Sequence, residues 1–473
     1  MSAQQRLLSL AAIVAVLFGS IAFGASNAVA AAAPVSVATG LSGTFFIAVG
    51  DDGALYGFDA GASNTETIKP PAGAPADATP LQRGLTGSVF RIAPNGTKTT
   101  IASGLPAYGG SGASGIVVAN GFVWLIISPS PAAQYGAKPY PNEGFLVKIA
   151  LQGGAVTPVA DLAGYENKNN PDGTDVNPNP YGLVLSPDGN LYATDAGGND
   201  LLKIAPATGQ IALATLFPTL PGTEANPELG GKKEAQAVPT GIVNAPGGGF
   251  FVTNLPGEGG APAPGSGKIV RVSADGKVSD FATGFNFAVN LAVGPDKQLY
   301  IAELVGGFGP QGPTPGKVSR VLADGTKQVI ADGLDTPHGL AFNAAGDLFI
   351  STGVASLGPP PPAPKGAIVR IDGVGKVAAP SPTPTATVVP TRAVTPVPTA
   401  TLPANTPTAT PPTMPGLPNT GAGGGTAVAA GEPSLPLLPF LALAALAAGR
   451  RWLRPAAAGA LVGSRQSAVG SRQ

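Results

Sequence analysis

The chain has 473 residues, and 27 lysines and arginines balance 27 aspartates and glutamates, so its formal net charge is zero. Nucleic-acid binding requires a basic face that displaces counterions from phosphates, so we expect no nucleic-acid partner. The absence of cysteine excludes disulfides, thiolate zinc sites and cysteine nucleophiles.

The first residues have the layout of a secretory signal peptide. Arg6 stands within the first few residues, an apolar run covers residues 7–23, and small residues at 28–30 supply a cleavage site. We therefore expect a signal peptide over residues 1–30 and an extracellular mature chain. An N-terminal membrane anchor is the alternative interpretation.

A β-hairpin pattern occurs six times between residues 34 and 377. Its turns and second strands are DDGALYGFD (51–59), ANGFVWLII (119–127), SPDGNLYATD (186–195), APGGGFFVTN (245–254), GPDKQLYIAE (294–303) and NAAGDLFIST (343–352). Asp-Gly and Asn-Gly tolerate the positive φ of a tight turn, which explains their place between apolar runs. Helical periodicity is absent, and we expect the Pro- and Gly-rich inserts, such as residues 164–180 and 218–237, to be loops.

A third strand follows in every copy and carries one basic residue at the same place. These residues are Arg91, Lys148, Lys203, Arg271, Arg320 and Arg370. We expect each to be a solvent-side charge whose stem lies on apolar neighbours. A fourth strand follows only five of the six, and PVSVATGL (34–41) matches the missing one. We therefore predict an all-β fold over residues 31–377, a six-bladed β-propeller closed by pairing of the N-terminal strand with the last blade.

Four segments of the repeat region carry a family resemblance, and the first two are its specific part: NPDGTDVNPNPYG (170–182), DAGGNDLLKI (195–204), VPTGI (238–242) and GFNFAVNLAVGPDKQLYIAE (284–303). They resemble segments of the ScyD/ScyE family, secreted NHL-like propellers named for their association with scytonemin biosynthesis. The resemblance covers about residues 34–377 and implies an exported NHL-like propeller. In the general NHL repeat an Asp ends the second strand and an Asn four residues later shapes the turn, which here are Asp195 and Asn199. The resemblance assigns no catalytic residue to this chain.

The single histidine, His338, stands just before the innermost strand of its copy. Aligning the copies puts Ser42, Ser114, Tyr181, Thr240 and Val289 at the same phase. In a propeller this phase can face the central channel. The candidate ligand-binding residues are Tyr181, Thr240, Asn290 and His338. His338 is also a candidate general base, because imidazole titrates near working pH. The alternative makes it one member of a mixed polar rim, and the variety of residues at this phase favours that interpretation.

The second strands end in a further set of residues: Asp59, Ile127, Asp195, Asn254, Glu303 and Thr352. Carboxylate and amide oxygens that converge on one mouth suit a hard cation such as Ca²⁺. The candidate metal ligands are therefore Asp59, Asp195, Asn254 and Glu303. The alternative is that these side chains bond to backbone amides at the strand ends. The Asn-rich loop over residues 167–180 is a second possible Ca²⁺ loop, but Asp172 and Asp175 lack EF-hand spacing, so we expect an ordinary loop.

Proline and threonine dominate residues 378–416, a composition that favours an extended polyproline-II stalk without a core. The next segment, 417–473, contains LPNTG, then an apolar stretch over residues 435–448 and the basic GRRWLR. This order resembles the sorting signal of sortase-anchored wall proteins. The sorting residues are then Leu417, Pro418, Thr420 and Gly421. The resemblance implies that a sortase cuts after Thr420 and joins it to the cell envelope. A plain membrane anchor is the alternative.

Two functions from different classes follow. One is a monomeric, non-catalytic display module that binds an extracellular glycan, small molecule or protein at the end of a stalk. The other is an extracellular lactonase-like hydrolase or lyase with a channel-bound divalent metal, because six-bladed lactonases of the gluconolactonase type use Glu, Asn and Asp for such a metal. The sequence favours the first, since no nucleophile, His pair or complete ligand set is apparent, and catalysis stays an open question.

Overall fold

The computed structural model describes residues 33–74, 78–255, 257, 265–309, 312–354 and 365–377. Within these ranges, six antiparallel sheets account for most strands. From the innermost strand outward, blade 1 comprises β2 (Ile47–Val49), β3 (Leu55–Asp59), β5 (Leu81–Ile92) and β6 (Lys98–Tyr108), with β4 (Glu66–Ile68) also paired to β5. Blade 2 comprises β7 (Ala113–Ala119), β8 (Phe122–Ile127), β9 (Phe145–Ala150) and β10 (Thr157–Asp161). Blade 3 comprises β11 (Pro180–Leu185), β12 (Leu191–Asp195), β13 (Asp200–Ile204) and β14 (Ile211–Leu216).

The second half of the ring has the same strand order. Blade 4 comprises β17 (Pro239–Asn244), β18 (Phe250–Asn254), β19 (Gly267–Val272) and β20 (Val278–Phe285). Blade 5 comprises β21 (Ala288–Val293), β22 (Leu299–Glu303), β25 (Gly316–Val321) and β26 (Lys327–Leu334). Blade 6 comprises β27 (Leu340–Phe342), β28 (Leu348–Thr352), β29 (Gly366–Ile371) and β1 (Val35–Leu41).

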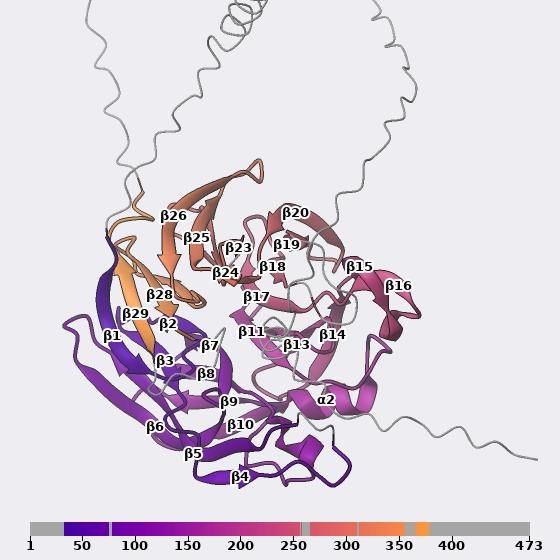
Figure 1. Ribbon diagram of the computed structural model, residues 1–473. Coiled ribbons are helices and arrows are strands. Elements are labelled where there is room, and N and C mark those ends of the chain that lie inside the picture. The colour runs from indigo at the N-terminus through magenta and orange to yellow at the C-terminus, as the bar shows by residue number, and fades with distance from the viewer. Residues whose placement is uncertain are drawn as a thin grey trace, which may run out of the picture. The chain divides into compact units, whose positions relative to one another are not determined.

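The innermost strands close a ring. They contact one another in the order β2, β7, β11, β17, β21 and β27, and β27 contacts β2 again. Figure 1 shows the sheets arranged around these inner strands. The described chain is therefore a six-bladed β-propeller, which confirms the predicted fold class.

Blade 6 combines the two ends of the described chain. Strand β1 pairs antiparallel with β29, and Leu41 lies opposite Gly366. A side chain at position 366 would not fit, because its Cβ would lie 2.4 Å from the carbonyl oxygen of Leu41. Leu41 packs in one apolar cluster with Ile368 of blade 6 and Phe90 of blade 1. The predicted closure by the N-terminal strand is confirmed.

The repeated basic residue of the third strand faces an aromatic residue in all six blades. The pairs are Tyr56 and Arg91, Trp124 and Lys148, Tyr192 and Lys203, Phe251 and Arg271, Tyr300 and Arg320, and Phe349 and Arg370. The Lys203 ammonium lies 5.6 Å from the centre of the Tyr192 ring, and the Arg320 guanidinium lies 5.4 Å from that of Tyr300. Such contacts contribute about 0.5–1 kcal/mol each at exposed sites. The neighbour directly across the ladder is thus an aromatic ring, while the predicted packing of the stem stays a prediction.

Two inserts predicted to be loops contain regular structure. Helix α2 (Leu162–Asn169) begins the first, and Asp161 caps it by accepting the backbone N–H of Gly164. The second insert forms the hairpin β15 (Leu220–Asn226) and β16 (Lys232–Ala235). The prediction of loops was wrong here because caps and packing against the blades, rather than an apolar period, stabilise such short elements. The remaining elements are the hairpin β23 (Gly307–Gly309) and β24 (Gly312–Thr314) and the 3₁₀ helices η1 (Pro131–Tyr135) and η2 (Pro227–Leu229).

The predicted targeting segments lie outside the described residues. These segments are the signal peptide 1–30, the stalk 378–416 and the sorting region 417–473, so they stay predictions. Within the described ranges, no helix is long and apolar enough to span a membrane.

Candidate functional site: the mouth of the ring

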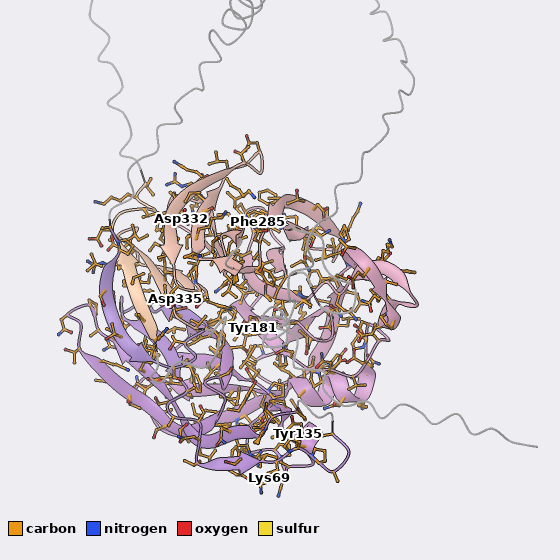
Figure 2. The ribbon with its side chains drawn as sticks, viewed as in Figure 1. Lys69, Tyr135, Tyr181, Phe285, Asp332 and Asp335 are labelled. Atoms are coloured by element: carbon orange, nitrogen blue, oxygen red, sulfur yellow. The ribbon has the colours of Figure 1, made fainter. Side chains whose placement is uncertain are left out.

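The predicted site residues belong to one end of the ring, which we call the mouth. At the mouth each innermost strand begins and each second strand ends, because the two are antiparallel neighbours. The register shows this directly, with Pro180 opposite Asp195, Pro239 opposite Asn254 and Ala288 opposite Glu303. Figure 2 shows Tyr181, one residue along from Pro180, near the middle of the ring.

His338 is buried in the mouth with both ring nitrogens engaged. Only 1% of the residue is exposed, Nδ1 lies 2.8 Å from the carbonyl oxygen of Phe45, and Nε2 lies 2.8 Å from the hydroxyl of Tyr181. A carbonyl can only accept, so Nδ1 must carry the proton and Nε2 must accept the Tyr181 O–H. Burial lowers the pKa of His338 to about 3, which keeps the ring neutral.

Aromatic rings surround the imidazole. Phe45 and Phe46 meet His338 edge-on with ring centres 5.3 and 5.0 Å away, and Phe46 also meets Tyr181 at 5.3 Å. All four residues are buried. We call Phe45, Phe46, Tyr181 and His338 the mouth cluster. It joins blades 1, 3 and 6 across the ring axis, so it stabilises the ring as well as filling its end.

The strand pairing corrects one of the residues that the sequence analysis aligned with His338. In blade 1, Ile47 pairs with Gly57 as Leu340 pairs with Ile350 in blade 6. The residue two before the pair is therefore Phe45, not Ser42. The sequence alignment slipped by three residues because the lead-in of blade 1 has additional residues before the strand.

The other two predicted ligand-binding residues are also buried and bonded within the protein. The Thr240 hydroxyl lies 2.8 Å from that of Thr253, and the Asn290 side-chain oxygen accepts the backbone N–H of Leu291 at 2.8 Å. With Tyr181 and His338, these residues form an internal polar layer. In this geometry none of the four presents a side chain to a ligand outside the ring.

The four candidate metal ligands lie on four blades and cap their own strand ends. Asp195 Oδ1 accepts the backbone N–H groups of Asn179, Gly197 and Gly198 at 2.8–3.0 Å. The other three act similarly: Asp59 accepts the N–H groups of Ser42 and Gly61, Glu303 accepts that of Asn286, and Asn254 donates to the carbonyl of Ala237. Within the described residues, no three His, Cys, Asp or Glu side chains form a ready-made metal site. Each of the four side chains therefore bonds to the backbone at the end of its own strand, and a channel metal stays a prediction.

Two further carboxylates, which the sequence analysis missed, lie near Asp195. Glu166 comes from helix α2, and Asp200 begins β13 directly opposite Asp195 in the ladder. Burial and then the neighbouring carboxylates raise the pKa values of Glu166, Asp195 and Asp200. A sequence signal for Asp200 did exist, since it follows Asp195 across a tight turn. No signal pointed to Glu166, because its helix was not predicted.

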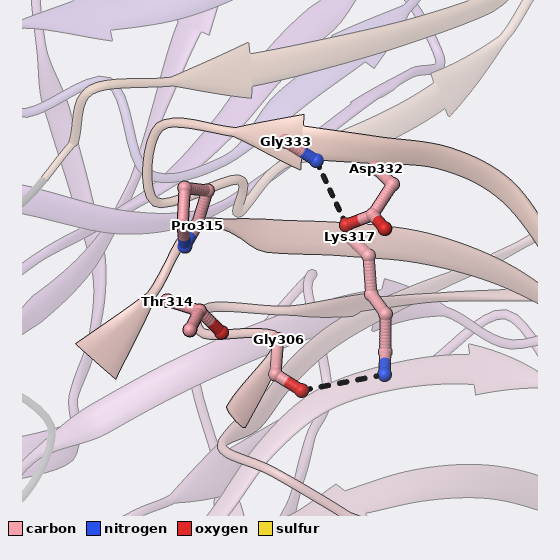
Figure 3. Close-up of a pocket in the computed structure, with 6 residues that line it drawn as sticks. All are labelled: Gly306, Thr314, Pro315, Lys317, Asp332 and Gly333. Atoms are coloured by element: carbon pink, nitrogen blue, oxygen red, sulfur yellow. Dashed lines mark hydrogen bonds between the residues drawn. The ribbon is translucent and has the colours of Figure 1, made fainter. Parts of the chain in front are cut away.

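An open depression of about 460 Å³ lies beside the mouth on blade 5. Its lining residues are Gly306, Thr314, Pro315, Lys317, Asp332 and Gly333. The Lys317 ammonium lies 3.5 Å from the carbonyl oxygen of Gly306, and Asp332 accepts the N–H of Gly333 at 2.8 Å (Figure 3). The same ammonium lies 3.6 Å from the buried Glu303 carboxylate. The depression therefore offers a cation, a carboxylate, a hydroxyl and a carbonyl within one small surface.

No protein-family model matches the chain, and neither does any curated protein sequence. Similar solved structures include virginiamycin B lyase from Staphylococcus aureus, 16% identical over 72% of this chain and 98% of that one, with a TM-score of 0.41. A gluconolactonase from Xanthomonas campestris is 12% identical over 72% and 89%, with a TM-score of 0.43. A luciferin-regenerating enzyme is 10% identical over 72% and 96%, with a TM-score of 0.44. Identities this low say nothing about activity, and the ring of six blades rests on the strand pairing described above.

Proposed function

We propose that the protein is an exported β-propeller of the ScyD/ScyE type that is held at the cell surface. There it binds a small polar ligand, such as a saccharide unit. One observation supports this proposal above the others. The side chains of Tyr181, Thr240, Asn290 and His338 are already bonded within the chain, which suits a rigid scaffold better than a site that must exchange protons with a substrate.

The hydrogen bonding of His338 leaves it poorly suited to act as a general base. A general base needs a lone pair directed at the substrate, and the only lone pair of the neutral ring accepts the Tyr181 O–H. The ring is also enclosed by Phe45 and Phe46. Catalysis by His338 would therefore require the mouth cluster to open.

The depression on blade 5 is the surface we assign to the ligand. Sugar hydroxyls both donate and accept hydrogen bonds, and the depression offers donors from Lys317 and Thr314 and acceptors from Asp332 and the Gly306 carbonyl. Lys317 is held by Glu303, so its ammonium is positioned before a ligand arrives. Preorganised polar groups of this kind reduce the entropy cost of binding.

Surface display rests on the sequence. The signal peptide, the Pro/Thr-rich stalk and the LPNTG motif follow the order of a sortase substrate, so we propose export and sortase-dependent attachment through Thr420. Thr420→Ala is expected to move the protein from the wall fraction to the membrane or medium. Wall attachment that is unchanged in this variant would exclude a sortase.

Binding is tested with a panel of soluble mono- and oligosaccharides and isothermal titration calorimetry on the full chain. Asp332→Asn and Lys317→Met are expected to weaken the binding at least about 10-fold, since each removes a charged hydrogen-bond partner. Lys268→Met is the matched control, because Lys268 begins the third strand of blade 4 and pairs with the exposed Asp280. Equal affinity in all three variants would remove the depression from the proposal.

The enzyme alternative is tested in the same preparation. Lactone and ester substrates are incubated with the wild type and His338→Gln, with and without Ca²⁺. Turnover by the wild type that falls about 10²–10⁴-fold in the variant would replace the binding proposal with a hydrolase or lyase. Folding of the variant is checked by circular dichroism, because His338 also joins three blades.

A further inference from the structure

Three buried carboxylates lie together in blade 3, and we call them the blade 3 acidic cluster. Glu166, Asp195 and Asp200 are 1%, 0% and 1% exposed. Asp195 ends β12, Asp200 begins β13, and Glu166 lies on the buried face of α2 with Leu162. Two of the side chains therefore come from the facing strands at the turn of one hairpin, and the third comes from helix α2.

The turn between β12 and β13 brings these groups close together. A Cβ at Gly198 would lie 2.9 Å from Glu166 Oε2 and 3.5 Å from Asp195 Cγ, so both carboxyl groups border this glycine. At Gly197 a Cβ would lie only 1.7 Å from the carbonyl oxygen of Asn177, so the loop before β11 covers the turn closely. The cluster is thus enclosed by the turn, the helix and this loop.

Both oxygens of Asp200 and Oδ2 of Asp195 have no hydrogen-bond partner. The Glu166 carboxyl has no partner of good geometry either, although the nearby backbone N–H of Asn177 lowers its pKa. Only Asp195 Oδ1 is satisfied, by three backbone N–H groups. None of the ion pairs among the described residues includes a member of the cluster. Buried charge without a partner costs several kcal/mol, so these carboxyl groups must take up either protons or a cation.

The residue opposite the end of the second strand differs between blades, and it is Ser88 in blade 1 and Ala367 in blade 6. It is Lys317 in blade 5, facing Glu303, and Lys268 in blade 4, facing Asn254. In blade 3 the same ladder position holds Asp200. Blade 3 therefore has two facing acids where blades 4 and 5 have a lysine, and α2 adds a third acid.

A fourth carboxylate stands at the edge of the cluster. Asp172, in the Asn-rich loop over residues 167–180, accepts a hydrogen bond from the side chain of Asn199 at 2.8 Å, and its charge acts on all three buried carboxylates. An all-oxygen set of carboxylates suits Ca²⁺, which takes six to eight oxygen ligands in flexible geometry. Zinc prefers nitrogen and sulfur ligands, and Mg²⁺ demands a tighter octahedron.

We propose that blade 3 binds one Ca²⁺ ion between α2 and the turn from β12 to β13, with Glu166, Asp195 Oδ2 and Asp200 as ligands and Asp172 at the edge. The described residues hold no ready-made group of three ligands, so the ion draws the carboxylates together on binding. The proposal is independent of what the mouth or the depression binds. It differs from the site predicted at the strand ends, because Asp59, Asn254 and Glu303 take no part.

The test is calorimetric titration of CaCl₂ into the full chain after treatment with EDTA and desalting, with thermal unfolding measured in parallel. We expect one site with a Kd of about 10⁻⁶–10⁻⁴ M and a rise in Tm of roughly 5 °C at 100 times the Kd. Asp200→Asn and Glu166→Gln are expected to weaken Ca²⁺ binding at least about 10-fold, and the Asp200 side chain has no hydrogen bond to lose.

Asp59→Asn is the matched control, because Asp59 also ends a second strand and accepts backbone N–H groups, but lies 3.7 Å from Lys98 instead of another acid. It is expected to keep the wild-type response to Ca²⁺. Absence of binding heat and of a Tm change in the wild type at up to about 10 mM Ca²⁺ would overturn the proposal. Wild-type affinity in both Asp200→Asn and Glu166→Gln would also overturn it, since the ion would then bind elsewhere.

Discussion

Blades 3 and 5 are built alike at the ends of their second strands and differ in the sign of one facing charged residue. Asp195 in blade 3 and Glu303 in blade 5 are both buried, and each accepts a backbone N–H from the segment leading into its blade at 2.8 Å. Directly across the ladder, blade 3 presents Asp200 and blade 5 presents Lys317. The same backbone thus holds an acidic pair in one blade and an ion pair in the other.

Both blades bury a carboxylate at the end of the second strand, and they differ in whether the chain itself supplies a compensating positive charge. In blade 5 the compensation is part of the chain, since the Lys317 ammonium lies 3.6 Å from Glu303 Oε2. In blade 3 no such group is supplied by the third strand, and Glu166 adds another negative charge. The proposed Ca²⁺ in blade 3 therefore has the role that Lys317 has in blade 5.

The largest expected loss of stability comes from opening the ring that holds both blades. Deleting residues 34–41 removes β1, which leaves the edge of β29 unpaired and exposes the apolar cluster around Ile368. We expect a loss of about 5 kcal/mol or more, comparable with the total stability of many domains. Thermal unfolding followed by circular dichroism measures it, and a truncation of residues 1–32 alone is the control. An unchanged Tm would contradict the role of β1 in closure.

Blade 5 can be converted to the charge pattern of blade 3. Lys317→Asp places a second acid against the buried Glu303, and we expect destabilisation by about 3–5 kcal/mol in urea unfolding at pH 7. The control is Lys268→Asp, because Lys268 faces the neutral Asn254 and its removal should cost less. Equal losses in the two variants would mean that the facing carboxylate does not decide the cost.

The converse change converts blade 3 to the pattern of blade 5. Asp200→Lys supplies a covalent positive charge beside Asp195 and Glu166, so it should stabilise the Ca²⁺-free protein by about 2–3 kcal/mol and abolish the response to Ca²⁺. Urea unfolding in EDTA and in Ca²⁺ measures both effects. A variant that still gains stability from Ca²⁺ would show that the lysine does not replace the ion.

The smallest expected effect is on the pH dependence of unfolding, to which His338 and Glu166 contribute in opposite directions. His338 has a folded pKa lowered to about 3, so below about pH 6.5 the unfolded chain binds a proton on this residue that the native state does not. The free energy of unfolding therefore falls as pH falls, by about 1.4 kcal/mol per pH unit, or roughly 2 kcal/mol at pH 5. The raised pKa of Glu166, about 7, acts in the other direction, because the Ca²⁺-free native state holds a proton that the unfolded chain releases above about pH 4.5.

Unfolding free energies at pH 7 and pH 5 in EDTA, for the wild type and His338→Gln, isolate the histidine contribution. We expect the wild type to lose about 2 kcal/mol relative to the variant on acidification. The same pH dependence in both proteins would mean that His338 is protonated in the native state.

Much of the fold could be predicted because its signals are local. Alternation of apolar and polar residues marked the strands, Asp-Gly turns marked the hairpins, and the count of third and fourth strands required closure by residues 34–41. The slip from Phe45 to Ser42 shows the limit of that approach. An irregular lead-in has no period, so only the pairing of Ile47 with Gly57 fixes its register.

The sequence by itself determined the number of blades, the position of the charged residue on each third strand and the end of the ring where polar residues gather. Each of these follows from strand periodicity and from short-range turn chemistry. The tertiary structure alone decided that the hydroxyl of Tyr181 meets His338, 157 residues further along the chain, and that Glu166 lies beside Asp195 and Asp200. Such contacts depend on how the closed ring and a short capped helix place distant segments, and no local pattern encodes that placement.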